Sequence, residues 1–249
     1  MNNFTKAILL SAGVLTITTT AYSQSITGKE IAGTMQIQGM FRESKLGQLN
    51  SILNANGIPS LPDNNYWLNL SMNRICKKMI FENGIGASFT SSSAANTANG
   101  ISAKYNQFQI YGRVGYNVAT RENMRLFPFV GLNFSQAMLR IRDDRRIQST
   151  SDFSQELLNS TSSKTLWNPR FGLEFGGGFD YLIATKDKQI DNYTIHRYIP
   201  IGVRIGYYLQ TSNAAWKIDD HNLNNGPSIK QSGVFVNVNI GLGYKVQKP

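Results

Sequence analysis

The sequence predicts an all-β chain, an eight-stranded antiparallel transmembrane β-barrel with long external loops and a short helix in the first loop. Three observations indicate this class. Long segments alternate apolar residues with polar residues or glycine, their connections alternate between long and short, and glycine gathers on the polar faces.

The last segment, residues 233–246, shows the alternation most clearly. Its sequence GVFVNVNIGLGYKV places Val, Ile, Leu or Tyr at every second position. Ordinary strands run about 5–6 residues, whereas strands that cross a bilayer need roughly 9–11. This segment is therefore long enough to cross a membrane.

The same period of two recurs seven times upstream, with bounds that are accurate to a few residues. The eight predicted strands cover about 31–41, 66–74, 79–89, 104–118, 125–141, 165–184, 195–210 and 233–246. Between the first two, Leu46, Leu49 and Leu53 share one helical face. We expect Ser44 to cap that helix, and Gly57 with Pro59 to end it.

The polar faces are predicted to line the lumen. Arg113, Glu174 and Arg204 lie in mid-strand on these faces, among many glycines. A solvent-exposed strand face would be weakened by so much glycine, while a narrow eight-stranded lumen needs small residues beside a few large polar ones. The opposite faces then meet lipid, and the residues assigned to lipid are Leu173, Ile201, Val203, Val236, Val238 and Ile240.

A lumenal ion-pair network is the constellation with the most chemical content. Arg113, Glu174 and Arg204 come from three predicted strands at similar depth, with Arg170 nearby. Opposite charges in a confined interior should gather, with Glu174 serving both Arg113 and Arg204. Eight strands leave little free interior, so we expect structural reinforcement rather than a gated pore.

The first 23 residues read as a secretory signal peptide, which leaves 24–249 as the barrel domain. A charged start with Lys6 precedes a short apolar run and the small residues Ala21 and Ser23. The single cysteine, Cys76, excludes an internal disulfide. We expect Cys76 near the periplasmic rim, and the segments 142–164 and 211–230 outside the cell.

The charge of the chain limits the classes of binding partner that we expect. The formal net charge is +10, or +9 once Lys6 is removed. Export argues against nucleic acid as a partner, so outer-membrane lipid and phosphorylated lipopolysaccharide are the expected acidic neighbours, and solvated loop charge is the alternative. External loops could also bind proteins. No segment approaches 18 apolar residues, which argues against a helical membrane protein.

Catalytic and metal chemistry have weak support. The only carboxylate–imidazole cluster is Asp219-Asp220-His221, which would need Asp143 or Asp144 to make a hydrolase. One cysteine and two distant histidines give no metal-ligand spacing. The glycines of FGGGF, residues 175–179, lack a following helix and Lys-Ser, so they indicate lumen packing rather than a phosphate loop. We therefore expect no enzyme activity, cofactor or metal.

The AYSQ processing site, the eight-strand spacing, the glycine-rich strands and the segment LNSILNANGIPSLP resemble the outer-membrane β-barrel family of Bacteroidota. That family includes PorT-type proteins and is broadly similar to OmpA-type barrels. The resemblance implies an outer-membrane location and no particular activity. The chain departs from the proteobacterial pattern because it lacks a terminal Phe and ends Tyr-Lys-Val-Gln-Lys-Pro.

Two function classes remain open. The first is a structural or loop-mediated interaction role, including a secretion accessory of PorT type. The second is a small-solute channel.

Overall fold

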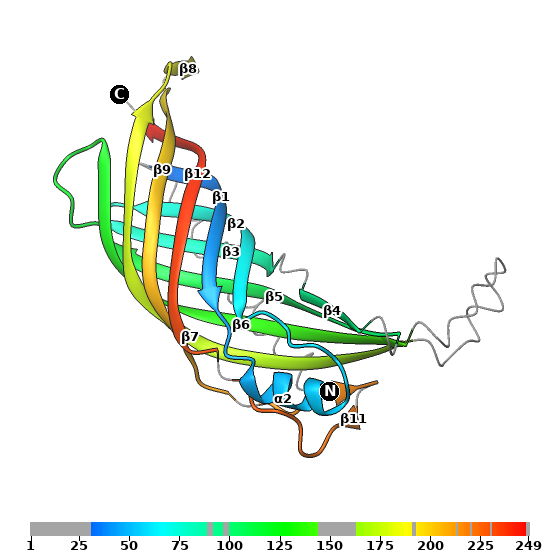
Figure 1. Cartoon of the computed structure of the whole chain (residues 1–249). Helices are drawn as coiled ribbons and strands as arrows, with labels where there is room; N and C mark the ends of the chain where they lie inside the picture. Colours follow the sequence, from blue (N-terminus) through cyan, green and yellow to red (C-terminus); the bar gives the residue numbers. More distant parts are fainter. Residues whose placement is uncertain are drawn as a thin grey trace.

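Eight long antiparallel strands close into one barrel in the computed structural model, as the sequence predicts (Figure 1). The residues described are 31–88, 92–96, 100–143, 163–190, 193–212, 214–219, 221–229 and 231–247. The strands are β1 Ile31–Glu43, β2 Asn64–Cys76, β3 Met79–Ser88, β5 Ile101–Tyr116, β6 Met124–Asp143, β7 Ser163–Ala184, β9 Tyr193–Gln210 and β12 Gly233–Gln247.

The barrel closes between its first and last strands. Each strand pairs with its neighbour in the order β1-β2-β3-β5-β6-β7-β9-β12, and β12 pairs with β1 from Ile31–Val246 to Arg42–Phe235. Closure removes both sheet edges, so the main-chain groups of these strands bond within the barrel. The predicted signal peptide lies outside the described residues.

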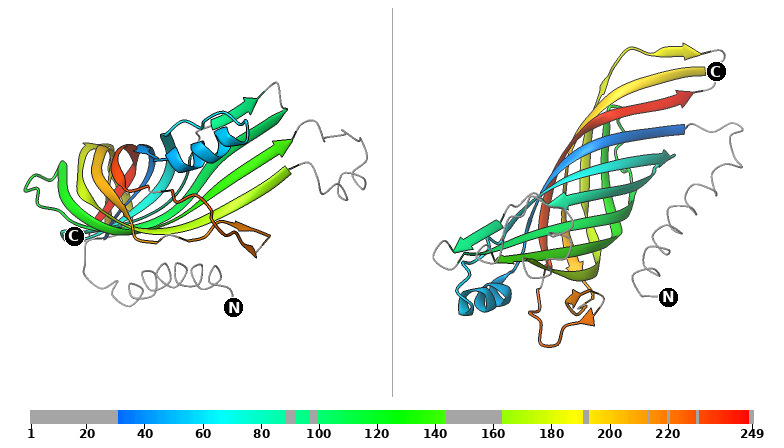
Figure 2. Two further views of the ribbon diagram at one scale, coloured as in Figure 1. Left: turned by 60° about the horizontal axis from the view of Figure 1, so that its bottom comes forward. Right: turned by 90° about the vertical axis from the view of Figure 1, so that its right-hand side faces the viewer.

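The two ends of the barrel differ, and they are called here the turn end and the loop end. At the turn end, Lys77 and Lys78 alone join β2 to β3, and the short strand β8 Lys188–Ile190 extends one hairpin. The loop end carries helix α2 Gly47–Ala55, the strand β4 Ser92–Asn96, and the hairpin of β10 Lys217–Ile218 with β11 His221–Asn222. Figure 2 shows α2 and β8 at opposite ends.

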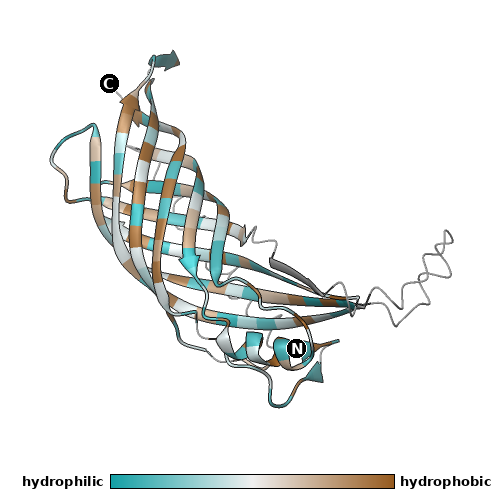
Figure 3. Ribbon diagram, in the orientation of Figure 1, coloured by the Kyte–Doolittle hydropathy of each residue, from teal (hydrophilic) through white to brown (hydrophobic). Residues whose placement is uncertain are grey.

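Exposed apolar side chains form a belt on the outward faces of the strands. Figure 3 shows the alternation along the strands as brown bands between teal and white ones. Among the residues assigned to lipid, Leu173 and Val236 are each 39% exposed, Ile201 is 44%, Ile240 is 54% and Val238 is 60%. Val203 points the same way but is partly covered. A continuous exposed apolar surface on a closed barrel is what a bilayer requires. No described helix is long and apolar enough to cross a membrane.

Helix α2 plugs the loop end, and its start differs from the prediction. Leu46, not Ser44, occupies the N-cap position, and its main-chain N–H donates to Asp63 Oδ1 at 3.0 Å. Ser44 lies buried below the helix and accepts hydrogen bonds from other side chains instead. The predicted end is as expected, because Gly57 takes a positive φ of 73° just after the C-cap Asn56.

The belt yields a depth test on one face of one strand. Val238→Arg, near the middle of β12, should destabilise the barrel in lipid by about 2–4 kcal/mol. Val234→Arg, at the start of the same strand, should cost about 0–1 kcal/mol. The measurement is the free energy of unfolding in lipid vesicles by denaturant titration, and equal costs at the two positions would contradict this placement of the belt.

Candidate functional site in the barrel interior

Arg113 is the centre of the charged interior. Its Nη1 lies 3.0 Å from Oε1 of Glu82, and its Nε donates to Oε2 of Glu174 at 2.6 Å. All three side chains are buried, with 1–2% of each side chain exposed. Burial removes them from water, so each charge depends on the others for compensation.

Strand register explains how Arg113 reaches both glutamates. Glu82 on β3 is its direct cross-strand neighbour, whereas on the other side Gly131 of β6 lies between Arg113 and Glu174 of β7. A Cβ on Gly131 would lie 2.7 Å from Cγ of Arg113. The missing side chain at Gly131 therefore opens the path by which Arg113 crosses β6.

A second group of charges centres on Asp180. Arg204 bonds it through two nitrogens, Nη1 to Oδ1 at 2.7 Å and Nη2 to Oδ2 at 3.0 Å. Asn239 donates to Asp180 Oδ1 at 3.1 Å. Arg204 Nε also approaches Glu82 Oε2 at 3.5 Å, so Glu82 joins the two groups into one network.

Neutral polar side chains also donate hydrogen bonds to the two glutamates. Gln38 donates to Glu82 Oε1 at 3.0 Å, and Asn133 donates to Glu174 Oε1 at 2.6 Å. Tyr111 in turn donates to Gln38 Oε1 at 2.9 Å. The network thus includes amides and a phenol from β1, β5 and β6, and it ties most of the barrel wall together.

Aromatic rings fill the space beside the guanidinium groups. Arg113 Cζ lies 4.2 Å from the Tyr111 ring centroid and 5.3 Å from those of Phe129 and Phe235. Arg204 Cζ lies 4.7 Å from the Phe127 ring. An apolar cluster lies beside these cation–π contacts, and together they fill the middle of the barrel. The cluster consists of Met40, Trp67, Ile80, Phe127, Phe129, Tyr208 and Phe235.

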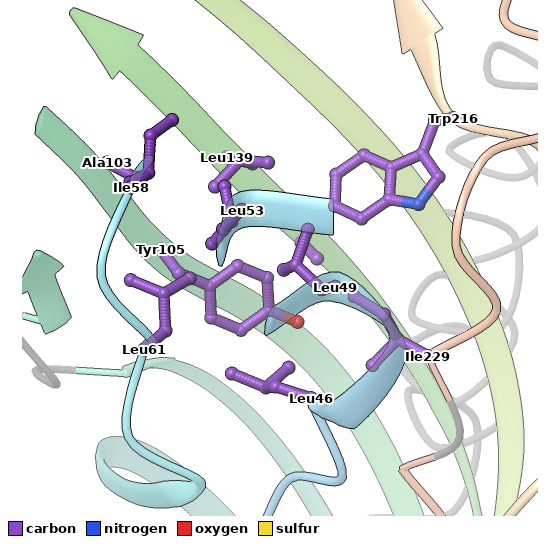
Figure 4. Close-up of a cluster of buried hydrophobic side chains, with 11 residues drawn as sticks. Leu46, Leu49, Leu53, Ile58, Leu61, Ala103, Tyr105, Leu139, Trp216 and Ile229 are labelled. Carbon is purple, nitrogen blue, oxygen red and sulfur yellow. The ribbon is translucent and has the colours of Figure 1, made fainter. Parts of the chain in front are cut away.

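The loop end is closed by a separate apolar layer, shown in Figure 4. Leucines of the α2 segment pack around Tyr105 and against Leu139 on the inner walls of β5 and β6, and Trp216 from the last loop covers them. Beneath this layer Gln231 donates to Gln107 at 2.6 Å and to Ser44 at 3.3 Å. The plug therefore has an apolar upper part and a polar lower part.

A pocket of about 1080 Å³ lies at the turn end. It is bordered by residues including Thr34, Asn73, Tyr111 and Tyr198. None of its lining residues belongs to the plug, and neither Arg113 nor Glu174 borders it. The open space thus reaches the edge of the network at Tyr111 but not its central pair, Arg113 and Glu174.

The structure rearranges the predicted network. Arg113 and Glu174 meet directly, but Arg204 reaches this pair through Glu82 and bonds mainly to Asp180. Arg170 stands apart, and its Nε donates to Asn168 Oδ1 at 2.6 Å. Glu82 and Asp180 were not predicted as members of the network. Each alternates with glycines on the polar face of its predicted strand, Glu82 with Gly84 and Asp180 with Gly178, and that was the available signal.

Most of the Asp/His cluster considered in the sequence analysis lies outside the described residues. His221 lies exposed in β11 and Asp219 precedes it with a positive φ of 44°. Asp144, Asp220 and the Asp143 side chain fall outside the described residues. Among those described, no three His, Cys, Asp or Glu residues are grouped so that they could hold a metal ion.

The comparisons with known proteins find similarity to solved structures only. No family model matches the sequence, and no curated protein matches it. Among solved structures, Neisserial surface protein A is 10% identical over 86% of this chain and 95% of its own, with a TM-score of 0.37. A major outer membrane protein from Thermus thermophilus is 9% identical over 86% and 98%, with a TM-score of 0.42.

The attachment invasion locus protein Ail of Yersinia pestis is 12% identical over 88% of this chain and 99% of its own, with a TM-score of 0.36. At these identities and scores, none of the similarities informs on binding or activity.

The ion network yields a double-mutant cycle. Glu174→Ala should cost about 3–5 kcal/mol, because it leaves a buried arginine short of a partner. Combined with Arg113→Ala, the cost should fall below the sum of the single changes by roughly 0.5–3 kcal/mol. The measurement is the free energy of unfolding in lipid vesicles.

The matched control pairs Glu174→Ala with Arg125→Ala, because Arg125 bonds to Tyr198 near the turn end. These two changes should be additive within about 0.5 kcal/mol. Additivity in both cycles, or the same coupling in both, would refute a direct Arg113–Glu174 interaction.

Proposed function

We propose that this chain is a closed, non-enzymatic outer-membrane barrel whose role is structural or is exerted by its external loops and rim. One observation carries the proposal: the middle of the barrel is filled by the Arg113 network and the aromatic rings around it. A lumen whose middle is filled by side chains offers no water-filled path for solutes.

The outer membrane is the location that fits a closed barrel with an apolar belt. Export would use the predicted signal peptide, Met1–Ser23, and the loop end would face outward. In this orientation Lys77 and Lys78 lie on the periplasmic side, and the plug and the long connections face the exterior. A secretion accessory of PorT type is one interaction role compatible with such loops.

Phosphorylated glycolipid is the partner that the rim favours. Lys104 of β5 and Arg140 of β6 are exposed and directly opposite each other, and Arg142 lies exposed further along the same strand. Like charges placed opposite on a sheet repel each other. They lie on the same face as the belt residue Phe108, where phosphates of lipopolysaccharide would neutralise them.

Conductance tests the closed state. The full mature barrel in a planar bilayer should show no steady current, and deletion of Gly47–Ala55 should not create one, because the ion network lies below the plug. A general porin in the same bilayers is the positive control. A stable ohmic conductance that changes with Glu174→Ala would instead support the small-solute channel.

Glycolipid binding tests the rim. Lys104→Gln with Arg140→Gln should weaken binding of purified lipopolysaccharide to the detergent-solubilised barrel, measured by co-purification at low salt, because two phosphate-facing charges are lost. Lys77→Gln with Lys78→Gln removes the same charge at the turn end and should leave binding unchanged. If both double variants lost the same amount of lipopolysaccharide binding, net charge alone would explain the binding, and a specific rim site would be contradicted.

A further inference from the structure

Two arginines in the half of the barrel nearer the loop end stand outside the ion network. Arg42, the penultimate residue of β1, is 0% exposed, and Arg170 of β7 is 1% exposed. They interact electrostatically with each other as like charges, and both interact with Tyr208. Two positive charges thus share one buried region.

Aromatic rings hold Arg42 without satisfying it. Its Cζ lies 4.7 Å from the Trp67 ring centroid on β2 and 4.5 Å from that of Tyr208 on β9. Ring faces stabilise the charge, but they offer no lone pair to the N–H groups of a guanidinium. The rings therefore fix where Arg42 lies and leave its hydrogen-bond donors available.

The unmet donors converge on this region. Within the described part of the chain, Nε, Nη1 and Nη2 of Arg42 and Nη1 and Nη2 of Arg170 have no hydrogen-bond partner. The Tyr208 hydroxyl makes no standard hydrogen bond either, although the Ser135 side chain lies beside it. Leaving charged donors buried and unbonded costs free energy well beyond that of a neutral group. An acceptor that carries negative charge would remove this cost.

The barrel's own carboxylates do not supply that acceptor. Glu174 interacts electrostatically with Arg42, but its oxygens accept hydrogen bonds from Arg113 and Asn133. Glu82 and Asp180 are likewise bonded to the network. Among the described residues, the buried arginines Arg42, Arg113, Arg170 and Arg204 outnumber the buried acids Glu82, Glu174 and Asp180 by one positive charge. Arg125, near the turn end, is not counted because it lies away from this region.

We propose that Arg42 and Arg170, with the Tyr208 hydroxyl, form a buried binding site for a small oxyanion of the phosphate class. Guanidinium groups match the oxygens of phosphate in pairs, and such charge-assisted bonds are among the strongest in proteins. An oxyanion would also neutralise the excess positive charge. Arg42 lies beside the Ser44 layer of the plug, because it is the cross-strand neighbour of Asn65, which donates to Ser44. Both arginines are buried, so the proposed ligand is a free anion rather than the headgroup of a membrane-anchored lipid.

The test uses the full mature barrel folded in an uncharged maltoside detergent and a buffer free of phosphate and chloride. Inorganic phosphate should bind saturably by isothermal titration calorimetry and raise the thermal unfolding temperature. Arg42→Met and Arg170→Met should each weaken phosphate binding by roughly tenfold or more. Without phosphate, both variants should unfold at or above the wild-type temperature, since each removes an uncompensated buried charge.

Arg121→Met is the matched control, because Arg121 is exposed at the turn end, and it should keep the full response to phosphate. If a Met variant does not fold, Arg42→Lys keeps the charge but loses the fork, and should still weaken binding. Lipid A in mixed micelles should not compete with phosphate, and competition would assign the site to a lipid headgroup. Absence of saturable binding, or binding unchanged in both Arg42 and Arg170 variants, would overturn the proposal.

Discussion

The interior of this barrel depends on the need to neutralise three buried carboxylates in a space with little water. Glu82, Glu174 and Asp180 are each bonded to an arginine and to an amide, and Glu82 links the two arginine groups. Removing one member exposes others to an uncompensated charge, so the network holds only as a unit. The partners come from strands far apart in the sequence, so the network also fixes how the wall closes.

Glycine and aromatic residues make this network possible. Gly131 leaves room for Arg113 to cross β6, and the rings of Tyr111, Phe129 and Phe235 fill the volume that the charged groups do not. The ion pairs and hydrogen bonds orient the charged side chains, and the rings fill the space around them. The result is an interior filled by charged and aromatic side chains.

The plug is independent of this core. Its apolar layer rests on Tyr105 and Leu139, in wall segments that extend toward the loop end. It can therefore change without opening the middle of the barrel. Arg42 and Arg170 lie between these two layers. Most of their guanidinium N–H groups are bonded neither by the plug nor by the ion network.

Alternation with a period of two was enough to predict the eight strands, because it fixes side-chain direction in a strand. The inward polar face followed from the glycines and charged residues on that face, and the helix of the first loop followed from the helical spacing of its leucines. Partner choice could not be predicted in this way. Glu174 was expected to serve Arg113 and Arg204, but cross-strand register puts Glu82 beside Arg113 and brings Asp180 to Arg204. The Ser44 cap was wrong because tertiary packing below α2 recruits that hydroxyl.

The most direct test of a closed interior built around Arg113 is the nuclear magnetic resonance signal of its Nε–H group in arginine-labelled barrel. We predict a proton protected from solvent exchange, since Nε donates to Glu174 within the buried network, and its protection should be lost in Glu174→Gln. Exchange as fast as that of the exposed Arg121 in the wild-type protein would contradict a closed interior built around Arg113.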